Sequence, residues 1–421
     1  MKNDTLFALK GNIIHTPSPK CFEVYENAFL VCKNGLIEEI TCEKPQNIPV
    51  CDYSGRIIIP AMTDLHLHAP QYTYRATGMD MELLEWLDKN AFPEESRYAD
   101  PDYADRAYTI FADDLKKSPT ANAVIFSTIH TNATLILMDK LENTGLNTMV
   151  GKVNMDRGCP EYIKETAAES LRETEKWIEG SKHFKNTTPI ITPRFYPACT
   201  DELLKGLAEI RRKYNLPVQS HLSENRDEIA LVQRLAPESR FYGDAYDRFG
   251  LFGGDYKTVM AHCVHSGDGE IELMAENGVF VAHCPQSNTN ICSGIAPVRR
   301  YLNYGLNLGL GTDVAGGAHL SMFRVITDAI QVSKLRQCTL DGSLPYLKLY
   351  EAFFMATKGG GAFFGKTGAF EKGYSADILV LNDSSIPSPR EFTALERLER
   401  IIYLTGYEAI EAKFVKGIKS I

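Results

Sequence analysis

Eight short apolar runs, each ending in polar or turn-forming residues, recur through the middle of this 421-residue chain. Segments rich in helix-forming residues separate them. A strand followed by a helix, repeated about eight times, predicts an α/β fold of the (β/α)8 TIM barrel type. The runs cover residues 57–68, 122–130, 146–156, 188–198, 216–225, 257–266, 278–288 and 306–317.

The intervening segments show helical patterns of different clarity. Segment 159–180 has many good helix formers and charges of both signs, which predicts a helix throughout. Segment 200–215 has an apolar stripe at helical spacing, and Thr200 is a suitable N-cap. Segment 76–119 is longer than a minimal crossover. We therefore expect it to add a loop and a helix beside the active site.

Both ends of the chain fall outside the repeat. Residues 7–17, 28–40 and 373–383 have the composition of short strands bounded by turn residues. We expect residues 1–59 and 372–421 to meet in a small composite β-sandwich domain, and residues 60–371 to form the barrel. His15, in the first of these strands, is expected at the surface.

Charge and cysteine usage narrow the partners and the compartment. The net charge is −9 and no Lys/Arg-rich run is present, which argues against nucleic acid and anionic membranes as partners. No apolar run reaches the ~20 residues that a bilayer span needs. The ten cysteines are scattered without a C-x-x-C pair, and the N-terminus lacks the apolar core of a signal peptide. A cytoplasmic protein with reduced thiols is expected.

Metal-ligand residues gather where a barrel places its chemistry. In the stretch "DLHLH", strand alternation would point His66 and His68 to one side, with Asp64 on the same face. Catalytic groups of such barrels lie at the C-terminal ends of the strands. Ligand-type residues occupy these ends in four of the runs, which predicts a metal site; they are His66, His68, His221, His262 and Asp313.

With these motifs, the chain resembles the amidohydrolase superfamily of metal-dependent hydrolases over essentially its whole length. The resemblance implies that the metal ligands are His66, His68, His221 and Asp313, with His262 touching or close to the attacking water. Members with two metals bridge them through a carboxylated lysine on the fourth strand, where this chain has Arg194 and no lysine. One Zn²⁺ per chain is therefore expected, with Fe²⁺ as the alternative.

Lys152 lies one strand earlier and leaves two interpretations open. It either bridges two metals or forms a salt bridge within the barrel, and the salt bridge is the simpler interpretation.

Longer motifs narrow the resemblance to the guanine deaminase family. They include "LLEWLDKNAFPEE", "VGKVNMDR", "TPRFYPACT", "SHLSEN" and "GTDVAGG". The resemblance implies hydrolysis of the 2-amino group of guanine to xanthine and ammonia, in purine catabolism, by a homodimer. Glu224, three residues after His221, is then the expected proton shuttle and Asp313 the expected proton acceptor. The alternative is that Glu224 caps the helix that follows.

The same resemblance places Gln71, Arg194 and Phe195 in the base pocket. Arg194 carries only donors, which suits O6 of guanine and opposes the 6-amino group of adenine. Gln71 can donate and accept at once. Phe195 either stacks on the base or belongs to the core, because adjacent strand residues face opposite ways.

Two other functions remain open at this point. A related deaminase or chlorohydrolase could act on another purine, a pterin or a triazine. The motifs around Gln71 and Arg194 favour guanine instead. A non-catalytic binding barrel is the remote alternative, and the presence of every expected ligand together with Glu224 argues against it.

Overall fold

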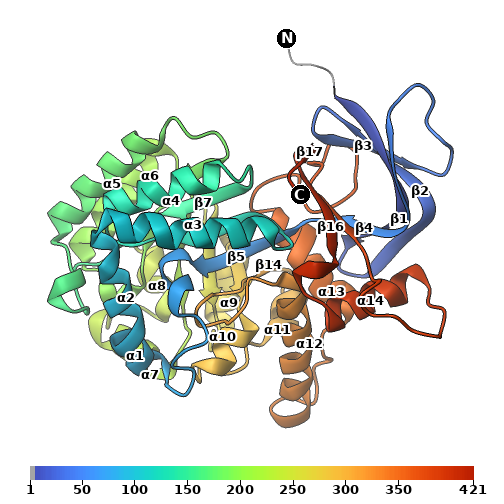
Figure 1. The fold of residues 1–421 in the computed structure, drawn as a ribbon. Coiled ribbons are helices and arrows are strands. Elements are labelled where there is room, and N and C mark those ends of the chain that lie inside the picture. Colours follow the sequence, from blue (N-terminus) through green and yellow to red (C-terminus); the bar gives the residue numbers. More distant parts are fainter. Residues whose placement is uncertain (1–4) are drawn as a thin grey trace.

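A computed structural model describes residues 5–421, so residues 1–4 of the expected first domain lie outside the described part. A barrel of parallel strands forms its centre (Figure 1). Each of the eight predicted runs supplies one strand position, which confirms the predicted barrel. The strands are β5 (Met62–His68), β6 (Thr120–Phe126), β7 (Asn147–Gly151) with β8 (Val153–Asn154), β9 (Thr187–Pro189) with β10 (Thr192–Pro193), β11 (Val218–Leu222), β12 (Thr258–His262), β13 (Phe280–His283) and β14 (Asn307–Leu310).

Backbone hydrogen bonds close the barrel at two joins. Strands β5, β6, β7 and β9 form one parallel ladder, and β11 to β14 form another. A bridge between Ile191 and Val218 connects the two ladders on one side. On the other side the amide of Asp313 donates to the carbonyl of His66 at 2.8 Å. The amide of His68 donates to the carbonyl of Val314 at 3.0 Å. The second join therefore sets two predicted metal-ligand segments side by side.

Helices surround the barrel, and two of them test the sequence predictions. Thr200 caps α6 as predicted, its side chain accepting from the amide of Leu203. The helix predicted over 159–180 was wrong at its start, because a capping box between Thr166 and Glu169 begins α5 only at Ala167. Within residues 5–421, no helix is both long enough and apolar enough to cross a bilayer. The helices following the strands are α3 (Pro101–Lys117), α4 (Thr131–Glu142), α5 (Ala167–Ser181), α6 (Asp201–Tyr214), α7 (Arg226–Leu235), α8 (Tyr242–Asp247), α9 (Asp268–Glu276), α10 (Pro285–Asn290), α11 (Val298–Asn303), α12 (Met322–Thr339) and α13 (Leu349–Phe354).

The long segment after β5 folds into a chain of short helical pieces. In Figure 1 its pieces α1 and α2 lie on the far side of the barrel from the terminal sheet. Further short turns occur at η4 to η7 elsewhere in the chain. The bounds are η1 (Ala69–Tyr74), α1 (Leu83–Trp86), η2 (Leu87–Ala91), α2 (Phe92–Ser96), η3 (Arg97–Ala99), η4 (Glu161–Ile163), η5 (Tyr196–Ala198), η6 (Met355–Gly359) and η7 (Tyr407–Ala409).

Strands from both ends of the chain form one seven-stranded sheet, in the order β17-β16-β15-β4-β1-β2-β3. Its curvature brings Leu36 opposite Ser375 in an isolated bridge. The sheet encloses an apolar cluster of its own, to which β1, β2, β4 and β15 contribute. This is the β-sandwich expected from the two termini. The strands are β1 (Leu6–Ser18), β2 (Cys21–Lys33), β3 (Leu36–Thr41), β4 (Val50–Pro60), β15 (Ile378–Leu381), β16 (Ile410–Val415) and β17 (Ile418–Lys419), with α14 (Ala394–Leu404) between β15 and β16.

His15 does not lie at the surface as expected. Its ring is buried, with ring centroids 6.3 Å from Tyr25 and 5.8 Å from Phe370. Phe370 comes from the other end of the chain, so only the folded sheet supplies the residues that cover His15.

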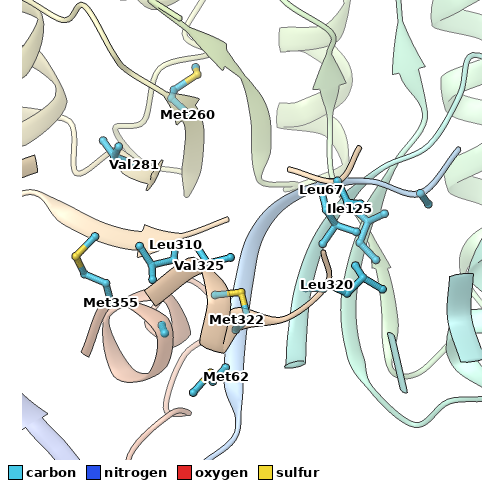
Figure 2. Close-up of a cluster of buried hydrophobic side chains, with 14 of the residues drawn as sticks. Met62, Leu67, Ile125, Met260, Val281, Leu310, Leu320, Met322, Val325 and Met355 are labelled. Atoms are coloured by element: carbon cyan, nitrogen blue, oxygen red, sulfur yellow. The ribbon is translucent and has the colours of Figure 1, made fainter. Parts of the chain in front are cut away.

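The main core lies between the barrel and its helices. In Figure 2, Met62 of β5 and Leu310 of β14 lie in one buried cluster with Met322 and Val325 of α12. A second cluster, which includes Leu65 and Phe280, fills the barrel interior ahead of the catalytic ends of the strands. Full burial of one such side chain contributes about 1.5–3 kcal/mol, so these layers provide a rigid support for the site.

A buried lysine joins the terminal sheet to the barrel. The side chain of Lys413 in β16 is fully buried, and its Nζ donates to the carbonyls of Lys116 and Ser118 at 2.9 Å and of Thr120 at 2.5 Å. Burial lowers the pKa of Lys413 to about 7, although Asp377 opposes this effect. Three carbonyl acceptors match the three donors of an ammonium group.

We predict that Lys413→Met lowers the free energy of unfolding by about 2–4 kcal/mol, because each buried carbonyl left without a donor costs about 1–3 kcal/mol. Denaturant-induced unfolding followed by circular dichroism measures this. The control is Lys419→Met on exposed β17, which should change stability by less than about 0.5 kcal/mol. Equal stability of the two variants would contradict a structural role for Lys413.

Candidate active site and metal centre

The structure brings the five predicted ligand-type residues together at the C-terminal ends of the strands. Asp313 Oδ1 lies 3.1 Å from His66 Nε2 and 3.4 Å from His68 Nε2. His221 Nε2 lies 3.3 Å from His68 Nε2, and His262 Nε2 lies 3.7 Å from Asp313 Oδ2. Ligand atoms in two overlapping groups of three therefore lie within 4.8 Å of one another.

This cluster suits a divalent metal ion. Within residues 5–421, the buried His66 Nε2 and His262 Nε2 have no hydrogen-bond partner. Buried polar atoms in native proteins are rarely left unsatisfied, and a cation would satisfy both nitrogens at once. Four imidazoles and one carboxylate are ligands that Zn²⁺ and similar ions accept.

A β-bulge shapes the "DLHLH" strand. The pairing with β6 runs from Asp64 opposite Ala123 to Leu67 opposite Ile125, so β5 holds one extra residue there. Asp64, expected on the histidine face, lies outside the metal cluster. Its carboxylate instead accepts from Thr312, at 3.0 Å from the amide and 2.5 Å from Oγ1. It thereby fixes β5 against the segment that carries Asp313.

Hydrogen bonds at the other ring nitrogen orient two of the histidines. His221 Nδ1 lies 2.5 Å from the carbonyl of Arg194, and His262 Nδ1 lies 2.8 Å from Asn288 Oδ1. Each contact engages Nδ1 and leaves Nε2 for the cluster. Burial lowers the pKa of His66, His68 and His221, which favours the neutral imidazole that binds metals.

Two site residues have strained backbones. His262 has φ 72° and Asp313 has φ 45°, both in the left-handed region. Such strain persists only where the surrounding structure imposes it, and it is concentrated at functional sites. Burial acts to raise the pKa of Asp313, but the adjacent histidines hold it well below its ordinary value.

Glu224 lies beside the cluster as a buried acid. It accepts from Ser293 Oγ at 3.1 Å, and its Oε1 lies 3.5 Å from His262 Nδ1. Burial, together with the negative charge of Asp313, raises the pKa of Glu224 to about 8. The helix-cap alternative is wrong, because Asn225 is the N-cap of α7 and Glu228 completes its capping box. Glu224 is therefore positioned to hold and transfer a proton.

One pocket joins this centre to the three residues expected to read the base. Gln71, Arg194 and Phe195 all line it. Phe195 also packs in a buried cluster, so its position fits both alternatives left open by the sequence. The segment after β5 contributes an apolar wall, as expected for an added active-site segment. The remaining lining residues are His68, Leu83, Trp86, Leu87, His221, Glu224, Glu228, His262, Ile291 and Asp313.

The sequence analysis missed two acidic residues of this region. Glu228 accepts from the amide of Glu224 at 3.1 Å and from the hydroxyl of Tyr242 at 2.8 Å, so it holds the Glu224 loop in place. Glu95 forms a two-point ion pair with Arg194 through bonds of 2.5 and 2.9 Å. Both residues lie within the quoted motifs or next to them, but neither has a spacing that distinguishes it from a surface acid.

Lys152 has a buried partner away from the metal cluster. Its Nζ lies 2.7 Å from Glu165 Oε2, and the lysine side chain is fully buried. The salt-bridge interpretation is confirmed. Lys152 is not among the clustered ligand residues of the part of the chain that the structure describes.

Comparisons with known proteins identify relatives of this chain. A sequence model of the Amidohydrolase family matches residues 57–418. Guanine deaminase of Mus musculus is 37% identical over 391 residues, which cover 89% of this chain and 85% of that protein. Guanine deaminase of Dictyostelium discoideum is 35% identical over 446 residues, covering 99% of this chain and 98% of that protein.

A solved structure matches just as extensively. The guanine deaminase from C. acetobutylicum with guanine bound in the active site has a TM-score of 0.96 and 45% sequence identity. The match covers 99% of this chain and 100% of that one. The chain therefore belongs to the amidohydrolase family and, within that family, to the guanine deaminases.

Proposed function

We propose that this protein hydrolyses the 2-amino group of guanine, which yields xanthine and ammonia. The observation that carries the proposal is one pocket that joins a cluster of metal-binding residues to a buried guanidinium and a buried amide. Hydrolysis at C2 of a purine needs an activated water and groups that hold the base, and this pocket offers candidates for both. The similarity to guanine deaminases over nearly the whole chain supports the same activity.

Recognition of the base is assigned to Gln71, Arg194 and Phe195. Arg194 is buried and donates to O6, where a charge-assisted hydrogen bond is stronger than a neutral one. Gln71 contributes a donor and an acceptor to the same edge. Phe195 lines the pocket and packs on the face of the base.

The metal is assigned to His66, His68, His221 and Asp313, as one Zn²⁺ per chain with Fe²⁺ as the alternative. When bound, such an ion supplies a Lewis acid that makes water a nucleophile at neutral pH. His262 lies close enough to Asp313 to steady that nucleophile by hydrogen bonding.

Three steps then fall to the side chains of the chain itself. Asp313 accepts a proton from the nucleophile and orients it toward C2. Glu224 delivers a proton to N3 of the ring, which makes C2 electrophilic. The water oxygen bonds to C2, the proton held by Asp313 passes to the 2-amino nitrogen, and the C2–N bond breaks so that ammonia leaves. The second proton of the water returns to Glu224, which leaves the C2 carbonyl of xanthine. The raised pKa of Glu224 fits a group that holds its proton until the base arrives.

The alternative functions make different demands. A deaminase or chlorohydrolase for another purine, a pterin or a triazine would not need a donor-only group at the O6 position. A non-catalytic barrel would not need Glu224 beside a complete ligand set. The homodimer, the cytoplasmic location and the division into residues 1–59 plus 372–421 and 60–371 stay predictions.

The first prediction concerns the metal. The protein as purified should hold about one equivalent of zinc per chain, as mononuclear sites do. His66→Ala should lose the metal and the activity together, because it removes a central ligand. Elemental analysis alongside circular dichroism measures this, with exposed His183→Ala as the control that keeps both. Two bound equivalents, or full activity after thorough chelation, would contradict a single catalytic metal.

The second prediction separates proton transfer from metal binding. Glu224→Gln should keep the metal and the fold but lose about 10²–10⁴-fold in turnover, the usual scale of general acid–base catalysis. Steady-state release of ammonia from guanine measures turnover, and Asp227→Asn, at an exposed position in the first turn of α7, is the control. Loss of metal from Glu224→Gln would make this residue a ligand, and normal turnover would remove it from the mechanism.

The third prediction concerns the base. Adenine would set its 6-amino donor against Arg194, and a site built to bond one group rejects an analogue that lacks it by about 10⁴–10⁵. Adenine also carries no 2-amino group to be lost, so that factor is a lower bound for it. We expect that scale of preference for guanine over adenine in kcat/KM, with little activity on cytosine, which is too small for the pocket. Comparable values for guanine and adenine would show that the pocket serves another substrate.

The fourth prediction concerns Arg194→Met, which should lose guanine activity far more than metal. This variant also leaves the Glu95 carboxylate buried without its cation, so Arg194→Met/Glu95→Gln is the comparison that restores charge balance. Guanine activity should stay low in both. Recovery of activity in the double variant would mean that Arg194 only neutralises Glu95.

A further inference from the structure

A single buried carboxylate contacts both polar side chains assigned to base recognition. Glu95 of α2 is 1% exposed, and its Oε1 accepts from Gln71 Nε2 at 2.8 Å. The same oxygen accepts from Arg194 Nη2 at 2.9 Å, and Oε2 accepts from Arg194 Nη1 at 2.5 Å. Three hydrogen bonds thus join residues from η1, α2 and the end of β10 into one unit.

The chemistry of a carboxylate determines how Gln71 must face. An ionised carboxylate only accepts, so Gln71 has to turn its NH₂ group toward Glu95. The carbonyl Oε1 then lies on the other side, 3.5 Å from the amide of Ala315. A flipped amide would set a carbonyl oxygen against the carboxylate. The donor and acceptor that Gln71 can offer to a ligand therefore keep fixed positions.

The orientation of Arg194 is fixed in the same way. Each of its two terminal nitrogens donates one hydrogen bond to the Glu95 carboxylate, which holds the guanidinium plane in line with that carboxylate. Arg194 Cζ lies over the ring of Phe92, 5.1 Å from its centroid, which limits rotation further. The remaining N–H groups then point in directions that Glu95 sets.

We propose that Glu95 is a positioning residue that sets which base edge the pocket accepts. Glu95 holds the Gln71 amide and the Arg194 guanidinium in one relative orientation. In that orientation the pocket is complementary to O6 of a 6-oxopurine and disfavours the 6-amino group of a 6-aminopurine. The inference rests on the proposed function, because it assigns the selectivity of that site to a residue that need not touch the base.

Glu94 provides a matched control on the same helix. It is also buried, at 9% exposed, but neither Glu94 nor its side-chain partners line the pocket. Its carboxylate accepts from Thr73 Oγ1 at 2.6 Å and from the hydroxyl of Tyr103, and it pairs with Arg97 at 3.3 Å. Glu94→Gln and Glu95→Gln are therefore the same chemical change on one helix. Only the change at Glu95 disturbs the base-reading pair, Gln71 and Arg194.

The test compares Glu95→Gln with Glu94→Gln on guanine and on 2,6-diaminopurine, which keeps the 2-amino group and replaces O6 by an amino group. In Glu95→Gln, kcat/KM for guanine should fall about 100-fold, the cost of a displacement near 1 Å in a positioned site. The loss should appear mainly in KM, with metal content unchanged. The value for 2,6-diaminopurine should not fall, so the ratio of kcat/KM for guanine to that for 2,6-diaminopurine should drop about 100-fold.

Glu94→Gln should keep guanine activity within about threefold and leave the ratio unchanged, because Glu94 contacts Thr73, Tyr103 and Arg97 and not the base-binding residues. Two results would overturn the inference. One is an unchanged ratio in Glu95→Gln, whether both substrates fall together or neither does. The other is an equal narrowing of the ratio in Glu94→Gln.

A shorter carboxylate keeps the test decisive if Glu95→Gln fails to fold. Glu95→Asp retains the charge for Arg194 but withdraws it by one methylene, so it should also narrow the ratio while metal content stays at the wild-type value. An unchanged ratio in this variant overturns the inference. Wild-type turnover of guanine tests the proposed function separately, since its absence refutes the activity whatever the variants do.

Discussion

The join between β14 and β5 is the constraint on which the site depends. Two backbone hydrogen bonds there, from Asp313 to His66 and from His68 to Val314, close the barrel and align its first and last catalytic segments. Asp64 strengthens the same join through Thr312. Without this closure Asp313 would lie at one edge of an open sheet, and His66 and His68 would lie at the opposite edge. In the closed barrel Asp313 Oδ1 lies 3.1 and 3.4 Å from the Nε2 atoms of these histidines.

Buried charge in this protein is arranged in compensated units. Lys413 meets three carbonyls, Lys152 meets Glu165, and Arg194 meets Glu95. Each unit satisfies a charge that would otherwise cost several kcal/mol to bury. The metal cluster differs, because His66 Nε2 and His262 Nε2 have no hydrogen-bond partner among residues 5–421. The contrast separates side chains that stabilise the fold from those kept available for a ligand.

Two adjacent regions of one pocket divide the work of the proposed reaction. The strand ends of the barrel supply the clustered histidines and Asp313, and Glu224 lies on the loop between β11 and α7. The segment after β5 supplies an apolar wall and, through Glu95, the orientation of the base-reading pair. Selectivity can therefore change with this segment while the hydrolytic centre stays the same. Barrels of this kind combine a fixed centre with variable loops.

Much of the fold was predictable because its signals are local. Strand-like runs, capping residues such as Thr200 and ligand types at strand ends are all visible within a few residues of sequence. Convergence of His66, His68, His221, His262 and Asp313 followed from barrel topology alone, since parallel strands of one barrel end at one mouth. The start of α5 was misjudged because a short capping box outweighed a long helical composition.

Other features depend on partners that are distant in sequence, so no local pattern specifies them. Glu95 is separated from Arg194 by 99 positions, and His15 from Phe370 by 355. Their burial depends on elements that meet only after folding. The bulge between Asp64 and Leu67 likewise reflects the pairing of β5 with β6, which the letters "DLHLH" do not show. The sequence by itself determined which chemical groups reach the mouth of the barrel. The tertiary structure alone decided how those groups are oriented, because orientation is set by hydrogen bonds between residues that are remote along the chain.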